Sequence, residues 1–136
     1  MSGARVFFDT NVLLYLLSEE SAKADRAEQT LAQGGFISVQ VLNEFASVAL
    51  GKFKMTHAEV RETLDTVRAI CKVEPLTVGS HDLALQLAER YGYSIYDSTI
   101  LASALKAKCV TVFSEDMQDG QLIEGSLVIR NPFAIR

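Results

Sequence analysis

Residues 5–12 read Arg-Val-Phe-Phe-Asp-Thr-Asn-Val, a short apolar run that ends in an aspartate. A run of this length and composition is typical of a buried β-strand, and Asp9 is the first acidic residue after it. Thr10 and Asn11 are residue types that cap helices, and apolar residues at helical spacing follow them. The stretch therefore predicts a strand, a carboxylate at its carboxyl end, and then a helix.

The alternation of strands and helices continues along the chain. Apolar runs predict strands at residues 5–9, 36–39, 73–78, 109–113 and 127–130. Helical periodicity and capping residues predict helices that begin near Thr10, Ser21, Gln40, Thr56, Ser80 and Asp97. Nearly continuous apolar strands joined by helices are typical of a parallel sheet covered on both faces. We therefore expect an α/β fold, in which Pro75 places the strand at 73–78 at the sheet edge.

Composition sets the broad class of protein. The chain has 136 residues, of which 49% are hydrophobic, so we expect a single domain over residues 1–136. No apolar stretch is long enough for a membrane span, and the N-terminus lacks the pattern of a signal peptide. We therefore expect a cytoplasmic protein with no membrane partner.

Cysteine and histidine placement argues against two kinds of site. Cys71 and Cys109 match no zinc or redox spacing, which favours two buried, reduced thiols. His57 and His81 have no second ligand at helical spacing, which argues against zinc and against a Ser-His-Asp triad.

The formal net charge is −4, and no basic tract is present. A nucleic-acid partner would therefore need bound metal ions and a local basic patch to offset repulsion. Lys52 and Lys54 are candidate phosphate contacts, although a solvated helix end explains them slightly better.

Four acidic residues lie at junctions between elements, each beside an apolar segment: Asp9, Glu44, Asp97 and Asp116. In parallel sheets the ligand site lies beyond the carboxyl ends of the strands, where Asp9 and Asp116 are expected. Glu44 borders the apolar stripe of its helix, and the helical register of Asp97 points it inward. If the fold brings the four together, their hard oxygen ligands suit Mg²⁺ or Mn²⁺.

Each of these acids also has a local interpretation. Asp9 and Asp97 fit as helix caps, Glu44 as a solvated helix residue and Asp116 as a turn residue. Against this, a carboxylate at the rim of a core is costly unless it is paired or bound to metal. The pattern alone supports the metal site and the local roles about equally.

Four motifs occur in one order along the chain: Phe-Asp-Thr-Asn-Val-Leu at 8–13, Asn-Glu-Phe at 43–45, Tyr-Asp-Ser at 96–98 and Phe-Ser-Glu-Asp-Met at 113–117. With these motifs, the whole chain resembles a PIN domain, and most closely the single-domain VapC-like toxin ribonucleases of bacterial toxin–antitoxin pairs. The resemblance implies a three-layer α/β/α PIN-like fold with a mainly parallel central sheet of four to five strands.

The resemblance also implies an activity and the residues that carry it. The activity would be that of a metal-dependent endoribonuclease, which hydrolyses phosphodiester bonds of RNA. The catalytic set would be Asp9, Glu44, Asp97 and Asp116, with Asp9, Asp97 and Asp116 holding Mg²⁺ or Mn²⁺. Glu44 would orient or deprotonate the attacking water. Asn11 would brace the site, Ser114 would lie near the metal, and Asp119 would contribute at the rim.

Partners follow from the same resemblance. The chain would be the toxin of a toxin–antitoxin pair, inhibited by a small VapB-like antitoxin, and would form a homodimer. The alternative is a non-toxin or catalytically silent PIN-like module that only binds RNA or protein. A phosphotransfer enzyme of the haloacid dehalogenase type needs a second Asp where the chain has Asn11. A receiver-like domain needs an acidic neighbour for Asp9 and a late Lys, and Ser114 occupies that later position.

Overall fold

The computed structural model describes residues 5–134. In chain order its elements are β1 (Val6–Phe8), α1 (Thr10–Leu14), the 3-10 helix η1 (Tyr15–Leu17), α2 (Ser21–Ala32), β2 (Gly35–Ser38), α3 (Val39–Gly51), α4 (His57–Ile70), β3 (Cys71–Glu74), α5 (Val78–Tyr91), α6 (Ile95–Lys106), β4 (Thr111–Phe113), β5 (Leu122–Ile123) and β6 (Leu127–Arg130). Within this part of the chain, no helix has the length and apolar character that crossing a membrane requires.

The sheet has six strands in the order β3-β2-β1-β4-β6-β5. The pairs from β3 to β6 are parallel, and β5 pairs antiparallel with β6. The strand that the apolar runs did not predict is β5, which has only two residues and pairs through Leu122 and Ile123. In the central register, Phe7 of β1 pairs with Phe36 of β2 and with Val112 of β4.

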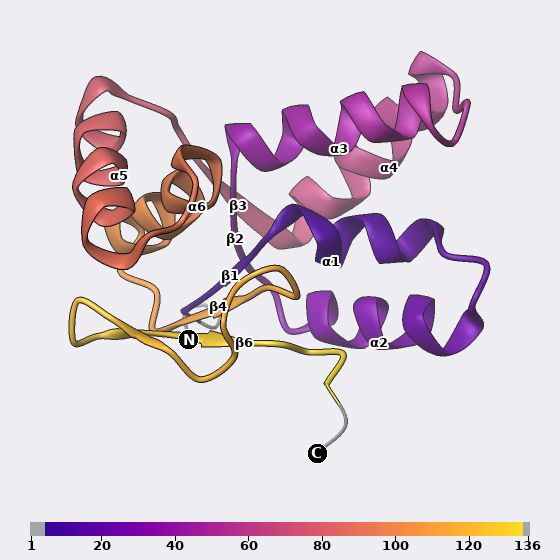
Figure 1. Cartoon of the computed structure of the whole chain (residues 1–136). Helices are drawn as coiled ribbons and strands as arrows, with labels where there is room; N and C mark the ends of the chain where they lie inside the picture. The colour runs from indigo at the N-terminus through magenta and orange to yellow at the C-terminus, as the bar shows by residue number, and fades with distance from the viewer. Residues whose placement is uncertain (1–4, 135–136) are drawn as a thin grey trace.

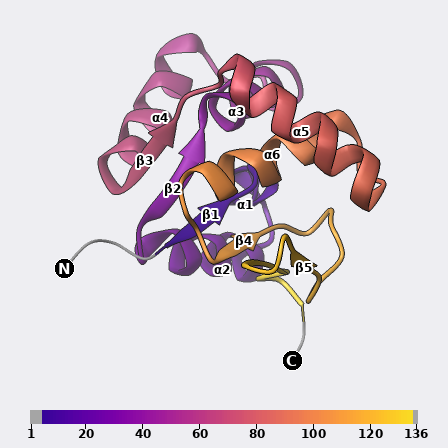
Figure 2. The same cartoon turned by 90° about the vertical axis from the view of Figure 1, so that its left-hand side faces the viewer.

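Helices cover both faces of this sheet (Figure 1). Helices α5 and α6 pack on each other and lie on one face, whereas α1, α2 and α3 lie on the other. Figure 2 views the molecule from the side of α5 and α6, with α2 behind the sheet. The side chains between these layers form the core, and Phe7, Ile37 and Ile129 are fully buried there. The predicted α/β class and the three-layer arrangement are confirmed.

One glycine brings β2 close to the strand that leads into Asp9. A side chain at Gly35 would place its Cβ only 2.6 Å from the Val6 carbonyl oxygen and 2.9 Å from the Phe8 ring. Only glycine avoids this overlap, so Gly35 allows β2 to pack this closely against β1.

Three helix N-caps differ from the residues at the predicted helix starts. Helix α1 begins at Thr10, as predicted, but Asp9 caps it in place of Thr10 or Asn11, so the local interpretation of Asp9 as a helix cap is confirmed. Thr77 caps α5 in a reciprocal capping box with Ser80, so that helix begins before Ser80. The neighbouring strand β3 is at the sheet edge, as expected, but it ends before Pro75.

The third difference concerns a candidate site residue. Helix α6 begins at Ile95 with Ser94 as its N-cap, because the Ser94 hydroxyl accepts a hydrogen bond from the Asp97 backbone N–H at 3.1 Å. The interpretation of Asp97 as a helix cap is therefore wrong. Its carboxylate is left available for another role.

The cysteines lie where the sequence places them. Cys71 and Cys109 are buried free thiols, and burial raises their pKa values to about 11 and about 12. Both histidines, His57 on α4 and His81 on α5, are exposed on the surfaces of their helices.

Candidate active site

Asp9 lies at the carboxyl end of β1, where the chain turns from strand into helix. Its backbone N–H donates to the Phe113 carbonyl oxygen at 2.9 Å, which extends the pairing of β1 with β4. The residue is only 4% exposed. Its carboxylate accepts hydrogen bonds from the Thr10 backbone N–H at 2.7 Å and from the Ser114 hydroxyl at 2.8 Å. Each carboxylate oxygen is therefore held by a different segment of the chain.

The pKa of Asp9 is raised from its ordinary value of 3.8 to about 7. Burial is the largest cause, because the ionised carboxylate loses its hydration. The hydrogen bonds from Ser114 and Thr10 lower the pKa, and the charges of Asp116 and Asp97 raise it. Two other predicted site residues thus lie near enough to Asp9 to repel its charge.

Glu44 projects from α3 toward the first turn of α1. The Thr10 hydroxyl donates to Glu44 Oε1 at 2.6 Å, so Thr10 touches two of the acids, one through its backbone and one through its side chain. One turn earlier on α3, Gln40 Nε2 lies 3.5 Å from the same oxygen and donates to the Tyr96 carbonyl oxygen at 3.1 Å. Gln40 therefore links the helix that carries Glu44 to the helix that carries Asp97.

Asp97 lies in the first turn of α6 and is half-buried. Within residues 5–134, its carboxylate takes part in none of the side-chain hydrogen bonds, since its backbone N–H alone bonds to Ser94. Partial burial raises its pKa, and the charges of Asp116 and Glu44 raise it further. Asp97 thus faces the other acids without a hydrogen-bond donor of its own.

Asp116 is held in the loop that follows β4. Asn11 Nδ2 donates to Asp116 Oδ2 at 3.1 Å, and Asn11 Oδ1 accepts from the Glu115 backbone N–H at 3.3 Å. The Asp116 backbone N–H donates to the Ser114 hydroxyl oxygen at 3.2 Å. The Asn11 amide therefore fastens this loop to α1.

Sequence reasoning missed the support beneath this loop. The Tyr15 hydroxyl bonds to Glu115, and this hydrogen bond is the largest cause of a raised pKa at Tyr15. Lys23 on α2 donates to the same hydroxyl at 3.4 Å. These partners lie on η1, α2 and the loop after β4, so no local pattern could have indicated them.

Asp119 contacts the segment that follows β6. Its Oδ1 accepts a hydrogen bond from the Asn131 backbone N–H at 2.9 Å, beyond the end of β6. This contact gives no support to the expected role of Asp119 at the rim of the acidic site.

Hydrogen bonds and electrostatic contacts therefore join Asp9, Glu44, Asp97 and Asp116 into one group at the carboxyl edge of the sheet. The two salt bridges in the described part of the chain are Lys23–Glu20 and Arg90–Glu124, so neither neutralises a member of this group. We call the four residues the acidic site. Clustered carboxylates with raised pKa values and without a basic partner are typical of functional sites and of cation sites.

The PIN domain family model matches residues 6–118, which span all four acids. The chain belongs to the PIN domain family. No curated protein sequence matches the chain closely enough to serve as a relative.

Solved structures share the PIN fold of this chain. A toxin–antitoxin complex from Klebsiella pneumoniae is 21% identical, with a TM-score of 0.72 over 96% of this chain and 99% of that one. VapC20 from Mycobacterium tuberculosis, described as a Sarcin-Ricin loop cleaving toxin, is also 21% identical, with a TM-score of 0.64 over 82% and 91% of the two chains. VapBC2 from Rickettsia felis, bound to a promoter DNA fragment, is 17% identical, with a TM-score of 0.62 over 93% and 97%. At these identities the likeness establishes the fold.

The donor chemistry of this PIN domain suits a divalent cation. All four acids offer hard carboxylate oxygens, and a bound cation would remove the repulsion that helps raise the pKa values of Asp9 and Asp97. Among residues 5–134, however, no three His, Cys, Asp or Glu side chains lie close enough together to hold a metal ion as they stand. The residue types therefore fit, and the carboxylates would have to draw together around the ion.

Proposed function

We propose that this PIN domain is a metal-dependent endoribonuclease that hydrolyses phosphodiester bonds in RNA. The observation that carries the proposal is the acidic site itself. It gathers carboxylates from four separate segments, raises the pKa of Asp9 to about 7, and has no basic ion-pair partner within residues 5–134. Maintaining such repulsion has a cost in stability, which is expected where the groups serve chemistry.

We assign Asp9, Asp97 and Asp116 as the ligands of Mg²⁺ or Mn²⁺. Such an ion, when bound, lowers the pKa of a water molecule and stabilises negative charge on a phosphoryl oxygen. Asp9 must give up its proton before it can act as a ligand at neutral pH, because its pKa is about 7. Asn11 keeps Asp116 turned toward the site through its Nδ2 contact.

Glu44 is assigned the role of orienting the attacking water or accepting its proton. The Thr10 hydroxyl holds Glu44 Oε1 at 2.6 Å, which fixes how the carboxylate is turned. Ser114 holds Asp9 in a similar way from the opposite side. In this assignment Thr10 and Ser114 act through the acids that they position.

A toxin role is supported by the names of the structural neighbours. One is described as a toxin that cleaves the Sarcin-Ricin loop, and another as a toxin–antitoxin complex. By this likeness we propose that the chain is the toxin of such a pair, with a small VapB-like antitoxin as its inhibitor, and that it acts as a homodimer in the cytoplasm. The alternative remains a non-toxin or catalytically silent module that binds RNA or protein.

The nuclease proposal is tested with purified protein, Mn²⁺ and a generic single-stranded RNA. Cleavage is expected for the wild type and should be lost in Asp9→Asn, which keeps the size of the side chain and removes its charge. Asp82→Asn, at an exposed position on α5, is the matched control and should cleave like the wild type. Cleavage that persists unchanged in Asp9→Asn would point to a contaminating nuclease and contradict the proposal.

The toxin role needs a test in cells. Induced expression of the chain alone should arrest growth, and Asp9→Asn should relieve the arrest at equal protein levels. Normal growth with active, soluble wild-type protein would favour a nuclease outside any toxin–antitoxin pair.

A further inference from the structure

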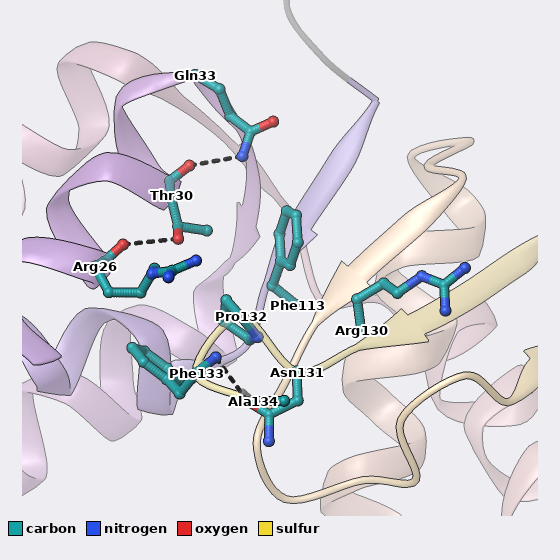
Figure 3. Close-up of a pocket in the computed structure, with 9 residues that line it drawn as sticks. All are labelled: Arg26, Thr30, Gln33, Phe113, Arg130, Asn131, Pro132, Phe133 and Ala134. Carbon is teal, nitrogen blue, oxygen red and sulfur yellow. Dashed lines mark hydrogen bonds between the residues drawn. The ribbon is translucent and has the colours of Figure 1, made fainter. Parts of the chain in front are cut away.

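A second polar cavity lies on the other side of the loop that carries Ser114 and Asp116. It has a volume of about 750 Å³ and opens between α2 and the segment that follows β6 (Figure 3). Its polar side chains from α2 are Arg26, Thr30 and Gln33, and Phe113 lies in its middle. Residues 130–134 form the remaining wall. We call it the arginine pocket, after Arg26 and Arg130.

The arginine pocket is positively charged in a chain whose net charge is −4. Among residues 5–134, its lining includes two guanidinium groups and no carboxylate. In the part of the chain that the structure describes, neither Arg26 nor Arg130 forms a salt bridge, since both ion pairs lie elsewhere. Two guanidinium groups that no acid neutralises offer fork-shaped donors for phosphate.

Helix α2 separates its charges by face. Arg26, Thr30 and Gln33 follow one another at i, i+4 and i+7, so they share the face that lines the arginine pocket. Asp25 and Glu28 line a different, smaller depression on the same helix. The acids of α2 are thus kept away from the arginines.

The shape of the pocket suits a chain of nucleotides. In Figure 3, Arg26 and Arg130 lie on opposite sides of the half-buried Phe113 ring. Single-stranded nucleic acids bind where basic side chains that contact phosphates alternate with aromatic rings that contact bases.

The arginine pocket is joined directly to the acidic site. The Arg130 carbonyl oxygen accepts a hydrogen bond from the Ser114 backbone N–H at 2.9 Å, and Ser114 also holds Asp9. The Phe133 ring meets the Tyr15 ring edge-on, with centroids 4.4 Å apart, and Tyr15 bonds to Glu115. The loop that carries Ser114 and Asp116 therefore contacts both the acidic site and the wall of the arginine pocket.

We propose that the arginine pocket binds phosphate groups of a single-stranded RNA that flank the bond cut at the acidic site, with Arg26 and Arg130 as the phosphate contacts. This inference rests on the proposed ribonuclease function and adds to it where the substrate strand runs. The pocket also supplies the local basic patch that the acidic composition of the chain would otherwise lack.

The test measures equilibrium binding of a fluorescently labelled single-stranded RNA to the full chain, with a chelator present so that no cleavage occurs. Arg26→Gln and Arg130→Gln should each weaken binding about fivefold and reduce the slope of log affinity against log salt by about 0.7. Arg61→Gln, at an exposed position on α4, is the control and should change neither quantity. Arg26→Lys and Arg130→Lys should keep the salt slope, because a point charge remains.

Cleavage assays on the same variants separate this inference from the function on which it rests. With Mn²⁺, the glutamine variants should raise KM for the RNA about fivefold and change kcat little. RNA affinity and salt slope that match the wild type in both glutamine variants would overturn the pocket assignment, whether or not RNA is cleaved. Absence of cleavage by the wild type would count against the ribonuclease function alone. Weaker binding of an acidic protein partner, with RNA affinity unchanged, would assign the pocket to protein recognition and also overturn the proposal.

Discussion

The Ser114 hydroxyl donates a hydrogen bond of 2.8 Å to Oδ2 of Asp9, across 105 positions of sequence. Both residues are buried, and each directly follows a strand, β4 for Ser114 and β1 for Asp9. Because these strands are parallel neighbours, the residues beyond their carboxyl ends meet at one edge of the sheet. The contact shows how sheet topology gathers distant polar residues into one site.

Ser114→Ala should raise the pKa of Asp9 further, because the variant removes a hydrogen bond that favours the ionised form. The acidic limb of the pH–rate profile should therefore move to higher pH. The free energy of unfolding should fall by about 1 kcal/mol, the usual net contribution of such a bond. Ser47→Ala, at an exposed position on α3, is the control for both measurements. An unchanged acidic limb in Ser114→Ala would show that Ser114 does not govern the ionisation of Asp9.

Asp9 should make the protein less stable as pH rises from about 4 to about 7. In the folded state its carboxyl holds a proton up to about pH 7, whereas in the unfolded state it ionises near 3.8. The folded state thus binds more protons across this window, so its stability falls with rising pH and levels off above about 7. The shift in the pKa of Asp9 from 3.8 to about 7 corresponds to a loss on the order of 4 kcal/mol in the free energy of unfolding across this pH range.

Denaturant unfolding in the presence of a chelator measures this effect. Asp9→Asn cannot titrate at this position, so its advantage in unfolding free energy over the wild type should grow between about pH 4 and 7. Asp82→Asn corrects for the general effect of losing an acid. If the plots of unfolding free energy against pH ran parallel for Asp9→Asn and the wild type, Asp9 would ionise at its ordinary pKa in the folded state.

Asp97→Ala should abolish RNA cleavage and leave the protein as stable as the wild type, or more stable, without metal. The reason is that the substitution removes like-charge repulsion from Asp116 and Glu44 and breaks no helix cap. Ser94→Ala is the matched comparison, since it removes the true N-cap of α6 and should cost about 1 kcal/mol. Thermal unfolding of the two variants at neutral pH without metal measures the change in stability that each substitution causes. A larger loss of stability in Asp97→Ala than in Ser94→Ala would restore the capping role.

Much of the fold could be predicted from local pattern. The central strands β1 and β2 are largely buried on both faces because helices cover the sheet on both sides, so their apolar signal is strong. The strand β5 could not be predicted, because two residues that pair with β6 carry no periodicity of their own. The start of α6 was misplaced because Ser94 and Asp97 are both good caps and lie three residues apart.

The acids could be predicted at the ends of elements, but the residues that hold them could not. Thr10, Gln40 and Tyr15 form hydrogen bonds to partners 34, 56 and 100 positions away in the sequence. Only the tertiary structure brings these pairs into contact. The loop after β4 contains several acids, and only the family resemblance favoured Asp116 over Asp119. In the structure Asn11 bonds to the Asp116 carboxylate, whereas the Asn131 backbone N–H bonds to Asp119.

The central claim is that Asp9, Asp97 and Asp116 together bind a divalent cation. Calorimetric titration of Mn²⁺ into the full chain, just below pH 7 and in buffers of different ionisation enthalpy, tests it most directly. The wild type should bind saturably and release protons, because Asp9 must lose the proton that its pKa of about 7 allows it to keep. Asp97→Asn should bind far more weakly. Asp9→Asn should release fewer protons. Absence of saturable binding, or binding equal in the wild type and both asparagine variants, would contradict the account.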